Sequence, residues 1–545
     1  MSISTNSSKE DSGIERKSSR FGLYAILLAL VTVLAAIMRL HSLTAKSFWL
    51  DEGFSIGFAR LSWPQFLHTI WSGRTVWFGE IYMLLYFFLL RLWMTFGNSE
   101  GFVRGLSVLF SVATIPIIYF LGARLFGRRA GLLAAALLAV NAYHIRYAQE
   151  ARGYAMLVFF AVLATWLFAR NLQEPSSAHW GMYAVVCALT TYSHFFGALL
   201  VPAHAISLLS WERDKIPWRK FLGSLLAYGA MIIPIMIFLS GLGRSGEPIS
   251  WIPPLQPDSL LVLGVDFTGV YGSTLLALDV LAIGIAALGA ARTRMSTEHT
   301  NYAWGYTLLF AWLVTPVVIT LTVSLVKPIF LPRYLSLCIP ALLLLVAVGI
   351  GRLRPAVLAW GLFIAISACS VLGDLRYYQS DFEMQRQDWR ALTSYVYDHS
   401  KPGDSIFFCD PGGEPPFEYY SWLRNSASLR PKTLRSQLRE DGNGPIPTDL
   451  KLDGLVDVPG TNFRIQPPDG GRVWLVLMSL SGSMQEYQRG VAVTNWISIG
   501  RQRVDERDFT PLKVILFERS ANSLPATGDQ PFTTNLYRHR TIQLR

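Results

Sequence analysis

Residues 21–41, FGLYAILLALVTVLAAIMRLH, form an apolar run that carries a single charge, at Arg39. An α-helix rises about 1.5 Å per residue, so about 20 residues cross a hydrocarbon core of roughly 30 Å. The run is therefore predicted to be a membrane-spanning helix. Further runs of similar length follow along the chain, and together they predict a polytopic α-helical membrane protein.

The composition supports this class of protein. Of the 545 residues, 52% are hydrophobic and only 16% are charged, and the mean hydropathy is +0.34. In a soluble domain about a quarter of the residues are charged. The net charge of +11 comes from cations between the apolar runs, which indicates membrane topology rather than a nucleic-acid partner. The four cysteines lack metal-ligand spacing and are interpreted as structural thiols.

Six cation-rich junctions separate the apolar runs, and the cytoplasmic loops of membrane proteins are enriched in Lys and Arg. With all six junctions in the cytoplasm, the runs alternate as about 11 transmembrane helices and the C-terminus lies outside. Residues 1–20 are polar and rich in serine, which predicts a disordered cytoplasmic tail. The predicted spans are 21–41, 105–126, 130–146, 153–170, 178–193, 195–211, 221–239, 271–291, 303–325, 334–351 and 355–372.

The segment 80–97, EIYMLLYFFLLRLWMTFG, is also apolar enough to cross the membrane. As a full span it would reverse the later topology and place Glu150 on the opposite side of the bilayer from Asp51 and Glu52. We therefore interpret the segment as an interfacial or re-entrant helix on the outer face. With that choice, distant parts of the chain converge on one face of the membrane.

The last third of the chain changes character, because it holds most of the acidic residues and several Pro/Gly turns. Helical patterning over 388–399 and apolar runs typical of strands over 405–409, 473–478 and 512–517 predict a small α/β domain. The predicted regions are a cytoplasmic tail (1–20), a transmembrane domain (21–375) and an extracytoplasmic α/β domain (376–545).

Two adjacent acids, Asp51 and Glu52, stand in WLDEGFS (49–55), just after the first predicted span. One interpretation is a solvated loop in which both acids cap a helix. The aromatic neighbours favour another, because a carboxylate beside apolar groups loses hydration and its basicity rises toward that of a general base. Adjacent helical residues diverge by about 100°. One acid is therefore expected to face a reacting centre and the other to support it.

A second cluster, YHIRYAQEARGY (143–154), joins two apolar runs with a dense set of polar and aromatic residues. Glu150 and Arg152 within it are interpreted either as caps of helix ends or as site residues. In the second case Glu150 faces the same cavity as Asp51, and an arginine binds an anionic oxygen through charge-assisted hydrogen bonds.

Two further candidates lie at expected outer turns. His194, in TYSHFFG (191–197), stands at a tight hairpin between apolar runs and is either a packing residue or a site residue. Lys327 and Arg333, in KPIFLPRY (327–334), are cations at an expected outer turn, although Lys and Arg are usually enriched on the cytoplasmic side. They are interpreted either as contacts to lipid head groups or as a site for a lipid-linked phosphate, held in a loop that prolines restrict.

Taken in order, these motifs resemble the bacterial GT-C glycosyltransferases of the protein O-mannosyltransferase-like group, which includes the aminoarabinose transferases that act on lipid A. The resemblance covers about residues 20–400, and the tail beyond it resembles no known family closely. The motifs are FWLDEGFS (48–55), FGNSEGFVRGLSVLF (96–110), LFGRRAGLLAAALLAVNAYHIRYAQEARGYA (125–155), TYSHFFGALLV (191–201), KPIFLPRYL (327–335) and DWRALTSYV (388–396).

The resemblance implies a GT-C fold and an integral membrane enzyme of the bacterial inner (plasma) membrane. Such an enzyme transfers a sugar from a polyprenyl-phosphate donor, on the periplasmic or extracellular face and with inversion. Carried over by position, Asp51 is the general base, Glu52 its neighbour in the acidic motif, Glu150 the second acid and His194 the hairpin histidine.

The same resemblance places Arg333 at the donor phosphate, and Lys327, Arg152 and Tyr334 are expected there with it. This chain has Tyr82-Met83-Leu84 where many relatives have Asn-Pro-Pro, so its first outer loop is expected to differ in geometry. No cofactor is required. A divalent cation would suit a site of carboxylates and phosphates, but the sequence does not require one.

The expected partners are the lipid bilayer, the lipid-linked sugar donor and an acceptor that is a glycan, a glycolipid or a protein. Mannose is the default sugar by resemblance alone. The alternative function is a transporter or flippase for lipid-linked sugars, which would hold its main charges near the bilayer midplane, often with repeated halves. The clustering of notable charges at one outer surface favours transfer, and the intact acidic pair argues against an inactive scaffold.

Overall fold

The computed structural model describes two compact units of the chain. The helical unit comprises residues 1–43 and 80–379, and the sheet unit comprises residues 44–79 and 380–545. The segment 44–79, which the sequence assigns to the transmembrane domain, thus packs with the C-terminal part. The residues described are 7–72, 82–244, 252–269, 272–294, 300–379, 387–409, 411–424, 432–433, 456–457, 464–465, 471–478, 484–509 and 511–520.

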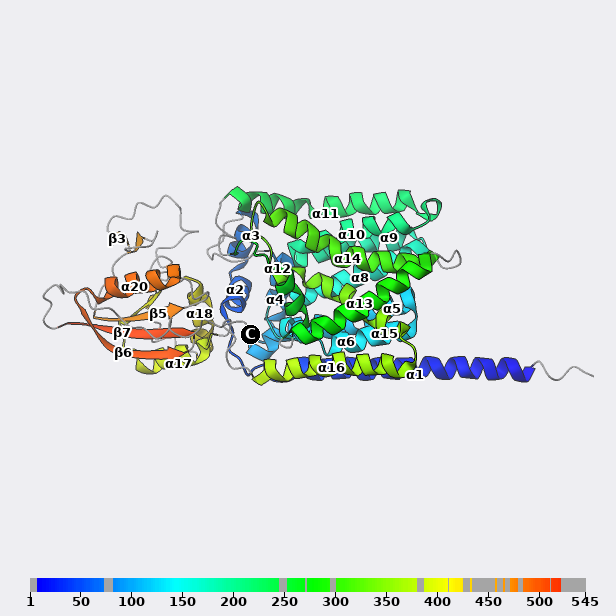
Figure 1. Cartoon of the computed structure of the whole chain (residues 1–545). Helices are drawn as coiled ribbons and strands as arrows, with labels where there is room; N and C mark the ends of the chain where they lie inside the picture. Colours follow the sequence, from blue (N-terminus) through cyan, green and yellow to red (C-terminus); the bar gives the residue numbers. More distant parts are fainter. Residues whose placement is uncertain are drawn as a thin grey trace, which may run out of the picture. The chain divides into compact units, whose positions relative to one another are not determined.

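The helical unit is built almost entirely from α-helices (Figure 1). Its described residues include eight helices that are long and apolar enough to cross a membrane. Its elements are α1 (Ser7–Leu40), α4 (Leu84–Trp93), α5 (Glu100–Phe126), α6 (Arg128–Ala139), α7 (Ala142–Ala148), α8 (Tyr154–Gln173), α9 (Ser177–Ser193), η1 (Phe195–Leu199), α10 (Leu200–Ser207), η2 (Leu208–Ser210), η3 (Arg213–Lys215), α11 (Trp218–Arg244), α12 (Ser259–Thr268), α13 (Gly272–Arg294), α14 (Thr300–Ser324), η4 (Pro332–Cys338), α15 (Ile339–Arg352) and α16 (Ala356–Gln379).

The predicted polytopic helical class is confirmed, and three of the predicted spans are not among the eight helices that are long and apolar enough to cross a membrane. The run 130–146 divides into α6 and α7, because Asn141 interrupts it and caps α7 by accepting the His144 N–H at 2.9 Å. The run 178–193 becomes α9, which has 17 residues. The run 195–211 begins and ends as tighter 3₁₀ turns. Hydropathy alone does not detect such local breaks.

Two other segments refine the predictions for the first hundred residues. The structure extends α1 back to Ser7, whereas the sequence predicts a disordered tail through residue 20. Extending an existing helix is far less costly than nucleating a new one. Within the segment 80–97, α4 has only 10 residues, about half of what a bilayer crossing needs. This short helix agrees with the interpretation that the segment does not span.

The centre of the helical unit is α15, whose side chains are almost all buried. The outer helices α1, α11, α13 and α16 instead leave many large apolar side chains exposed, as expected for surfaces that face lipid. Helices in membranes pack closely through small residues, and α15 approaches α13 in this way. A Cβ atom added at Gly349 of α15 would lie 1.9 Å from the carbonyl oxygen of Ala282 in α13.

Replacing Gly349 with alanine should therefore lower stability by about 1–3 kcal/mol, the usual cost of overpacking a well-packed interior. Gly351, in the same helix, is the matched control because a Cβ there meets no atom within 4 Å. Gly351→Ala should leave stability unchanged or raise it, since alanine is the better helix former by about 1 kcal/mol. Thermal unfolding of the purified protein in detergent measures both, and equal transition temperatures would contradict the close approach.

The sheet unit contains a five-stranded sheet of order β2-β1-β5-β7-β6, in which β1 runs parallel to β2 and β5, and β7 runs antiparallel to β5 and β6. The predicted small α/β domain is confirmed, with strands at the three predicted runs. Its elements are α2 (Leu50–Ala59), α3 (Trp63–Ser72), α17 (Trp389–His399), β1 (Ser405–Phe408), η5 (Pro411–Gly413), α18 (Glu414–Leu423), β2 (Lys432–Thr433), the β3 (Val456–Asp457) and β4 (Arg464–Ile465) pair, β5 (Arg472–Met478), α20 (Met484–Ser498), β6 (Arg501–Phe509) and β7 (Leu512–Arg519).

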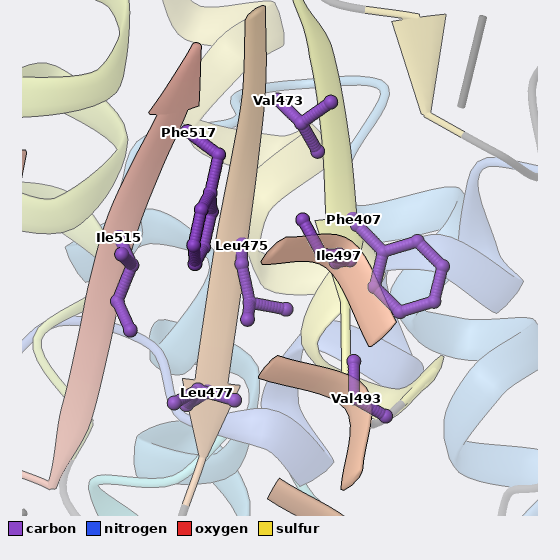
Figure 2. Packing of buried hydrophobic residues seen from close by; sticks show 8 residues of the cluster. All are labelled: Phe407, Val473, Leu475, Leu477, Val493, Ile497, Ile515 and Phe517. Atoms are coloured by element: carbon purple, nitrogen blue, oxygen red, sulfur yellow. The ribbon is translucent and has the colours of Figure 1, made fainter. Parts of the chain in front are cut away.

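The two faces of the sheet follow the period of two in β5. Val473, Leu475 and Leu477 point to one face and pack with Val493 and Ile497 of α20, together with Phe407, Ile515 and Phe517 (Figure 2). The opposite face carries Trp474, whose indole N–H donates to Asp404 at 2.8 Å and whose ring meets Tyr395 of α17 edge-on. Helices therefore cover both faces of the sheet, α20 on one and α17 on the other.

Candidate active site

The turn between α7 and α8 carries the predicted residues Glu150 and Arg152, and both side chains are buried. The Arg152 N–H donates to the Glu150 carbonyl at 2.8 Å, which closes the turn. The Ser107 hydroxyl on α5 donates to the Arg152 carbonyl at 3.1 Å. Glu150 Oε1 lies 3.7 Å from Nε of Arg146, one helical turn earlier. The turn is therefore held against α5 and places the Glu150 carboxylate beside the Arg146 guanidinium.

His194, between α9 and η1, is completely buried in a cluster of aromatic rings. Its Nδ1 accepts the Phe196 N–H at 3.2 Å. The His194 ring centroid lies 4.8 Å from that of Tyr334 and 5.8 Å from that of Tyr154. The structure thus brings together two predicted site residues that are far apart in sequence, and Tyr154 links them to the Glu150–Arg152 turn.

Arg333 joins the same neighbourhood through Tyr147 at the end of α7. Burial raises the pKa of the Tyr147 hydroxyl to about 12, the charges of Arg146 and Arg333 act against this shift, and the charge of Glu150 adds to it. Arg333 also lies over the Tyr334 ring, with Cζ 5.7 Å from the centroid. The helical unit therefore gathers Arg333 and Glu150 around one buried phenol, in a setting where charges interact strongly.

The segment that departs from the Asn-Pro-Pro pattern lies against this cluster. Met83 Sδ is 3.2 Å from the Gly153 nitrogen, and the Tyr82 carbonyl accepts the Phe195 N–H at 3.2 Å. The Tyr82 ring centroid lies 6.3 Å from that of His194. The thioether and phenol of this chain thus occupy positions beside the candidate residues, where a change of residue alters the shape of the site.

Lys327 is placed differently from the other predicted cation of its loop. It follows the end of α14, where its N–H donates to the Val323 carbonyl at 2.9 Å, and its side chain is exposed. Arg333, by contrast, is partly buried at the first turn of η4. Among the described residues, only Arg333 of these two cations contacts the aromatic cluster.

Asp51 and Glu52 lie in the first turn of α2, in the sheet unit, and both are buried: Asp51 is 8% exposed and Glu52 is 0% exposed. The Glu52 carboxylate accepts the N–H of Trp49, the residue before the helix, at 3.3 Å. This bond is the second half of a capping box. The Glu52 carboxylate therefore helps to hold the start of α2.

The predicted site residues accordingly form two groups. Asp51 and Glu52 belong to the sheet unit. The group in the helical unit consists of Glu150, Arg152, His194, Arg333 and Tyr334, with Lys327 apart from the cluster.

Sequence reasoning missed a buried polar network in the helical unit, centred on Arg39 at the end of α1. The Arg39 guanidinium donates to the carbonyls of Leu138 and Ala139, at 3.1 and 2.9 Å, where α6 ends. It also donates to Ser111 Oγ at 2.6 Å and to His144 Nδ1 at 2.9 Å. The signal in the sequence was the single charge in an otherwise apolar run. An arginine in such a run requires partners.

The network continues to the candidate site through Gln149, the residue before Glu150. The Gln149 side-chain amide donates to the carbonyls of Arg39 and His41, at 2.9 and 2.7 Å. Arg39 therefore fixes the start of α7 and Gln149 fixes its end. Both ends of the segment that leads to Glu150 are tied to α1.

The sequence leaves a divalent cation possible. Within the part of the chain that the structure describes, no group of three or more His, Cys, Asp or Glu side chains is placed to hold a metal ion. Of the four cysteines, two are buried and two are partly buried.

Residues 83–240 match the family model described as dolichyl-phosphate-mannose-protein mannosyltransferase. In three dimensions the chain is similar to ArnT from Cupriavidus metallidurans in the apo state, with a TM-score of 0.57 and 12% identity over 92% of this chain and 99% of that one. The same protein bound to undecaprenyl phosphate gives a TM-score of 0.56 and 12% identity over 92% and 98% of the two chains.

The archaeal oligosaccharyltransferase AglB from Archaeoglobus fulgidus, in complex with an inhibitory peptide and a dolichol-phosphate, is also similar. Its TM-score is 0.52, with 10% identity over 95% of this chain and 77% of that one. At such identities, these structures establish a common fold. No curated protein matches the chain in sequence.

The predicted resemblance is confirmed: residues 83–240 match this family model, and the chain shares the fold of ArnT and AglB. It is an integral, multi-pass membrane protein.

Proposed function

We propose that the protein transfers a sugar from a polyprenyl-phosphate donor to a hydroxyl group of an extracytoplasmic acceptor, with inversion at the anomeric carbon. The observation that carries this proposal is the cluster in the helical unit, where the cations Arg152 and Arg333 lie with Glu150 and His194 among buried aromatic rings. Preorganised guanidinium groups in a water-poor site stabilise the charge of a departing phosphate. The ArnT complex with undecaprenyl phosphate supports a donor of this kind.

In the proposed reaction, the acceptor oxygen attacks the anomeric carbon while the bond from that carbon to the phosphate oxygen breaks. The acceptor proton moves to the Asp51 carboxylate, and the electron pair of the broken bond leaves with the lipid phosphate. Arg333 and Arg152 neutralise that phosphate. The reaction produces one glycoside and one polyprenyl phosphate.

We further propose that the site faces the periplasm or exterior of a bacterial inner membrane and that mannose is the first sugar to test. The family description of residues 83–240 supports mannose. The acceptor is a glycan, a glycolipid or a protein. Deleting the gene and comparing exported glycans and glycolipids by mass spectrometry identifies the acceptor, because the unmodified form accumulates.

The direct test uses purified protein in vesicles and a radiolabelled polyprenyl-phosphate sugar. Label that moves onto an acceptor supports transfer. Label that changes leaflet without changing carrier supports the alternative, a flippase for lipid-linked sugars. Among the described residues, Asp279 within α13 and Asp374 within α16 are buried acids inside candidate spans, which is where such a transporter would hold its charges.

Replacing Arg333 with alanine should raise the KM for the donor by about 10- to 100-fold, because a hydrogen bond to a charged group contributes about 1.5–3 kcal/mol. Lys327→Ala is the matched control, since this cation of the same loop is exposed and should change KM by less than about threefold. Steady-state kinetics with varied donor measures both. Equal effects of the two substitutions would show that only the charge of the loop matters.

A further inference from the structure

The side chain of the capping residue of α2, Trp49, offers no acceptor to the first N–H groups of the helix. The four first N–H groups of a helix need acceptors from outside it, and Trp49 at the capping position has a side chain that only donates. The Glu52 carboxylate serves the Trp49 N–H. The acceptor for the Leu50 N–H comes from far along the chain.

That acceptor is Gln387, whose side chain is 1% exposed. Its Oε1 accepts the Leu50 N–H at 3.1 Å and the indole N–H of Trp389 at 2.7 Å. Its backbone carbonyl accepts the hydroxyl of Ser47 at 2.6 Å. One residue of the C-terminal domain therefore binds the acidic segment at two points, on both sides of Phe48.

Tyr420 of α18 makes a third attachment between these two points. Its phenol oxygen accepts the N–H of Phe48 at 2.7 Å. The Phe48 side chain is completely buried, with its ring edge-on to that of Tyr419 at a centroid distance of 4.8 Å. The Ser47 hydroxyl and the N–H groups of Phe48 and Leu50 thus each donate a hydrogen bond to a residue more than 330 positions later in the chain.

Helix α2 also packs closely against helix α18. A Cβ atom added at Gly53 of α2 would lie 2.5 Å from Cδ and 2.7 Å from the backbone nitrogen of Pro416 in α18. Only glycine fits there without movement of one helix. Gly53 follows Asp51 and Glu52 directly, so the contact with α18 lies within one helical turn of the acids.

We propose that Gln387 and Tyr420 are positioning residues for Asp51, so that the C-terminal domain sets the place and orientation of the acid that takes the acceptor proton. This inference rests on the proposed role of Asp51 as general base. Its physical basis is that the start of α2 has no other cap of its own for Leu50, and an error of about 1 Å in the placement of a catalytic group costs on the order of 100-fold in rate.

The test compares Gln387→Leu and Tyr420→Phe with the native enzyme in the transfer assay. Each removes one acceptor and keeps the bulk of the side chain. We expect kcat to fall by about 10- to 100-fold while the donor KM stays within about twofold, because the proposed phosphate ligands are other residues. Donor-lipid binding stoichiometry gives the concentration of folded sites, so that kcat refers to intact protein.

Tyr395→Phe is the matched control, because it removes a phenol hydrogen bond in the same domain, to Asp505 on β6. It should leave kcat unchanged even if it lowers the unfolding temperature as much as Tyr420→Phe does. Gln387→Glu keeps an acceptor oxygen for Leu50 and should restore kcat to within about tenfold of the native value. Native kcat in both Gln387→Leu and Tyr420→Phe would overturn the inference, and so would an equal loss in Tyr395→Phe.

Asp51→Asn in the same assay separates this inference from the proposed function. If Asp51→Asn loses transfer while Gln387→Leu and Tyr420→Phe keep it, the positioning role alone is refuted. If Asp51→Asn keeps transfer, the proposed role of the acid is refuted and the positioning role with it.

Discussion

Asp51→Asn should lower the turnover of sugar transfer by about 10²- to 10⁴-fold, the usual contribution of a general base. Asparagine matches aspartate in size, so the packing of this buried residue is preserved, but its amide cannot take a proton from the acceptor. Donor affinity and the unfolding temperature should stay close to native values. Turnover measured with the radiolabelled donor, and binding of the donor lipid measured separately, check both parts of this expectation.

Glu52→Gln tests the role of the neighbouring acid. Its amide oxygen can still accept the Trp49 N–H that the carboxylate accepts in the native protein, so α2 should keep its capping box. We expect its turnover to stay within about tenfold of the native value, because its role is to hold the helix rather than to move a proton. The reverse outcome, a severe loss in Glu52→Gln with an active Asp51→Asn, would exchange the roles of the two acids.

Replacing Arg39 with leucine should lower the stability of the helical unit by about 2–4 kcal/mol. The substitution leaves the carbonyls at the end of α6 without their donor, and each unsatisfied buried group costs about 1–3 kcal/mol. Removing the buried charge offsets part of this cost, which keeps the expected total below the sum of the lost bonds. Transfer should also fall, since Gln149 and the turn that carries Glu150 are tied to the same end of α1.

Arg39→Lys and Arg219→Leu complete this experiment. Lysine keeps the charge but not the planar fork that reaches Ser111, His144 and two carbonyls at once, so its loss of stability should be intermediate. Arg219 is exposed on α11, and Arg219→Leu should change stability by less than about 0.5 kcal/mol. Thermal unfolding in detergent ranks the three variants. A native transition temperature for Arg39→Leu would show that the network contributes nothing to stability.

The spans and the strands of the sheet core were predictable because their signals are local. An apolar run of about 20 residues indicates a crossing wherever it stands, and the alternation in β5 is visible over a few residues. Strand β6, RQRVDERDF, was missed because it is an edge strand with mostly exposed, charged side chains. Charged edges prevent pairing with other chains, and they also remove the apolar pattern that marks a strand.

The candidate residues were predictable as residue types in motifs, but their partners were not. A pair of adjacent carboxylates after the first span, a turn with Glu150 and Arg152, and a hairpin histidine stand out in the sequence. The contact of His194 with Tyr334, and the effect of Arg333 and Glu150 on the Tyr147 hydroxyl, join segments that lie on different helices. Only the packing of those helices brings such groups within range of each other.

From the sequence alone came the membrane class, the two regions and the acidic motif, because length, hydropathy and residue order are properties of the unfolded chain. The hydrogen-bond partners around Asp51 and Glu52 came from the fold. Glu52 accepts a backbone N–H beside it, while Leu50 and Phe48 are bound by Gln387 and Tyr420. Hydrogen bonds between residues more than 330 positions apart leave no periodic pattern in the sequence, and they exist only once the chain has folded.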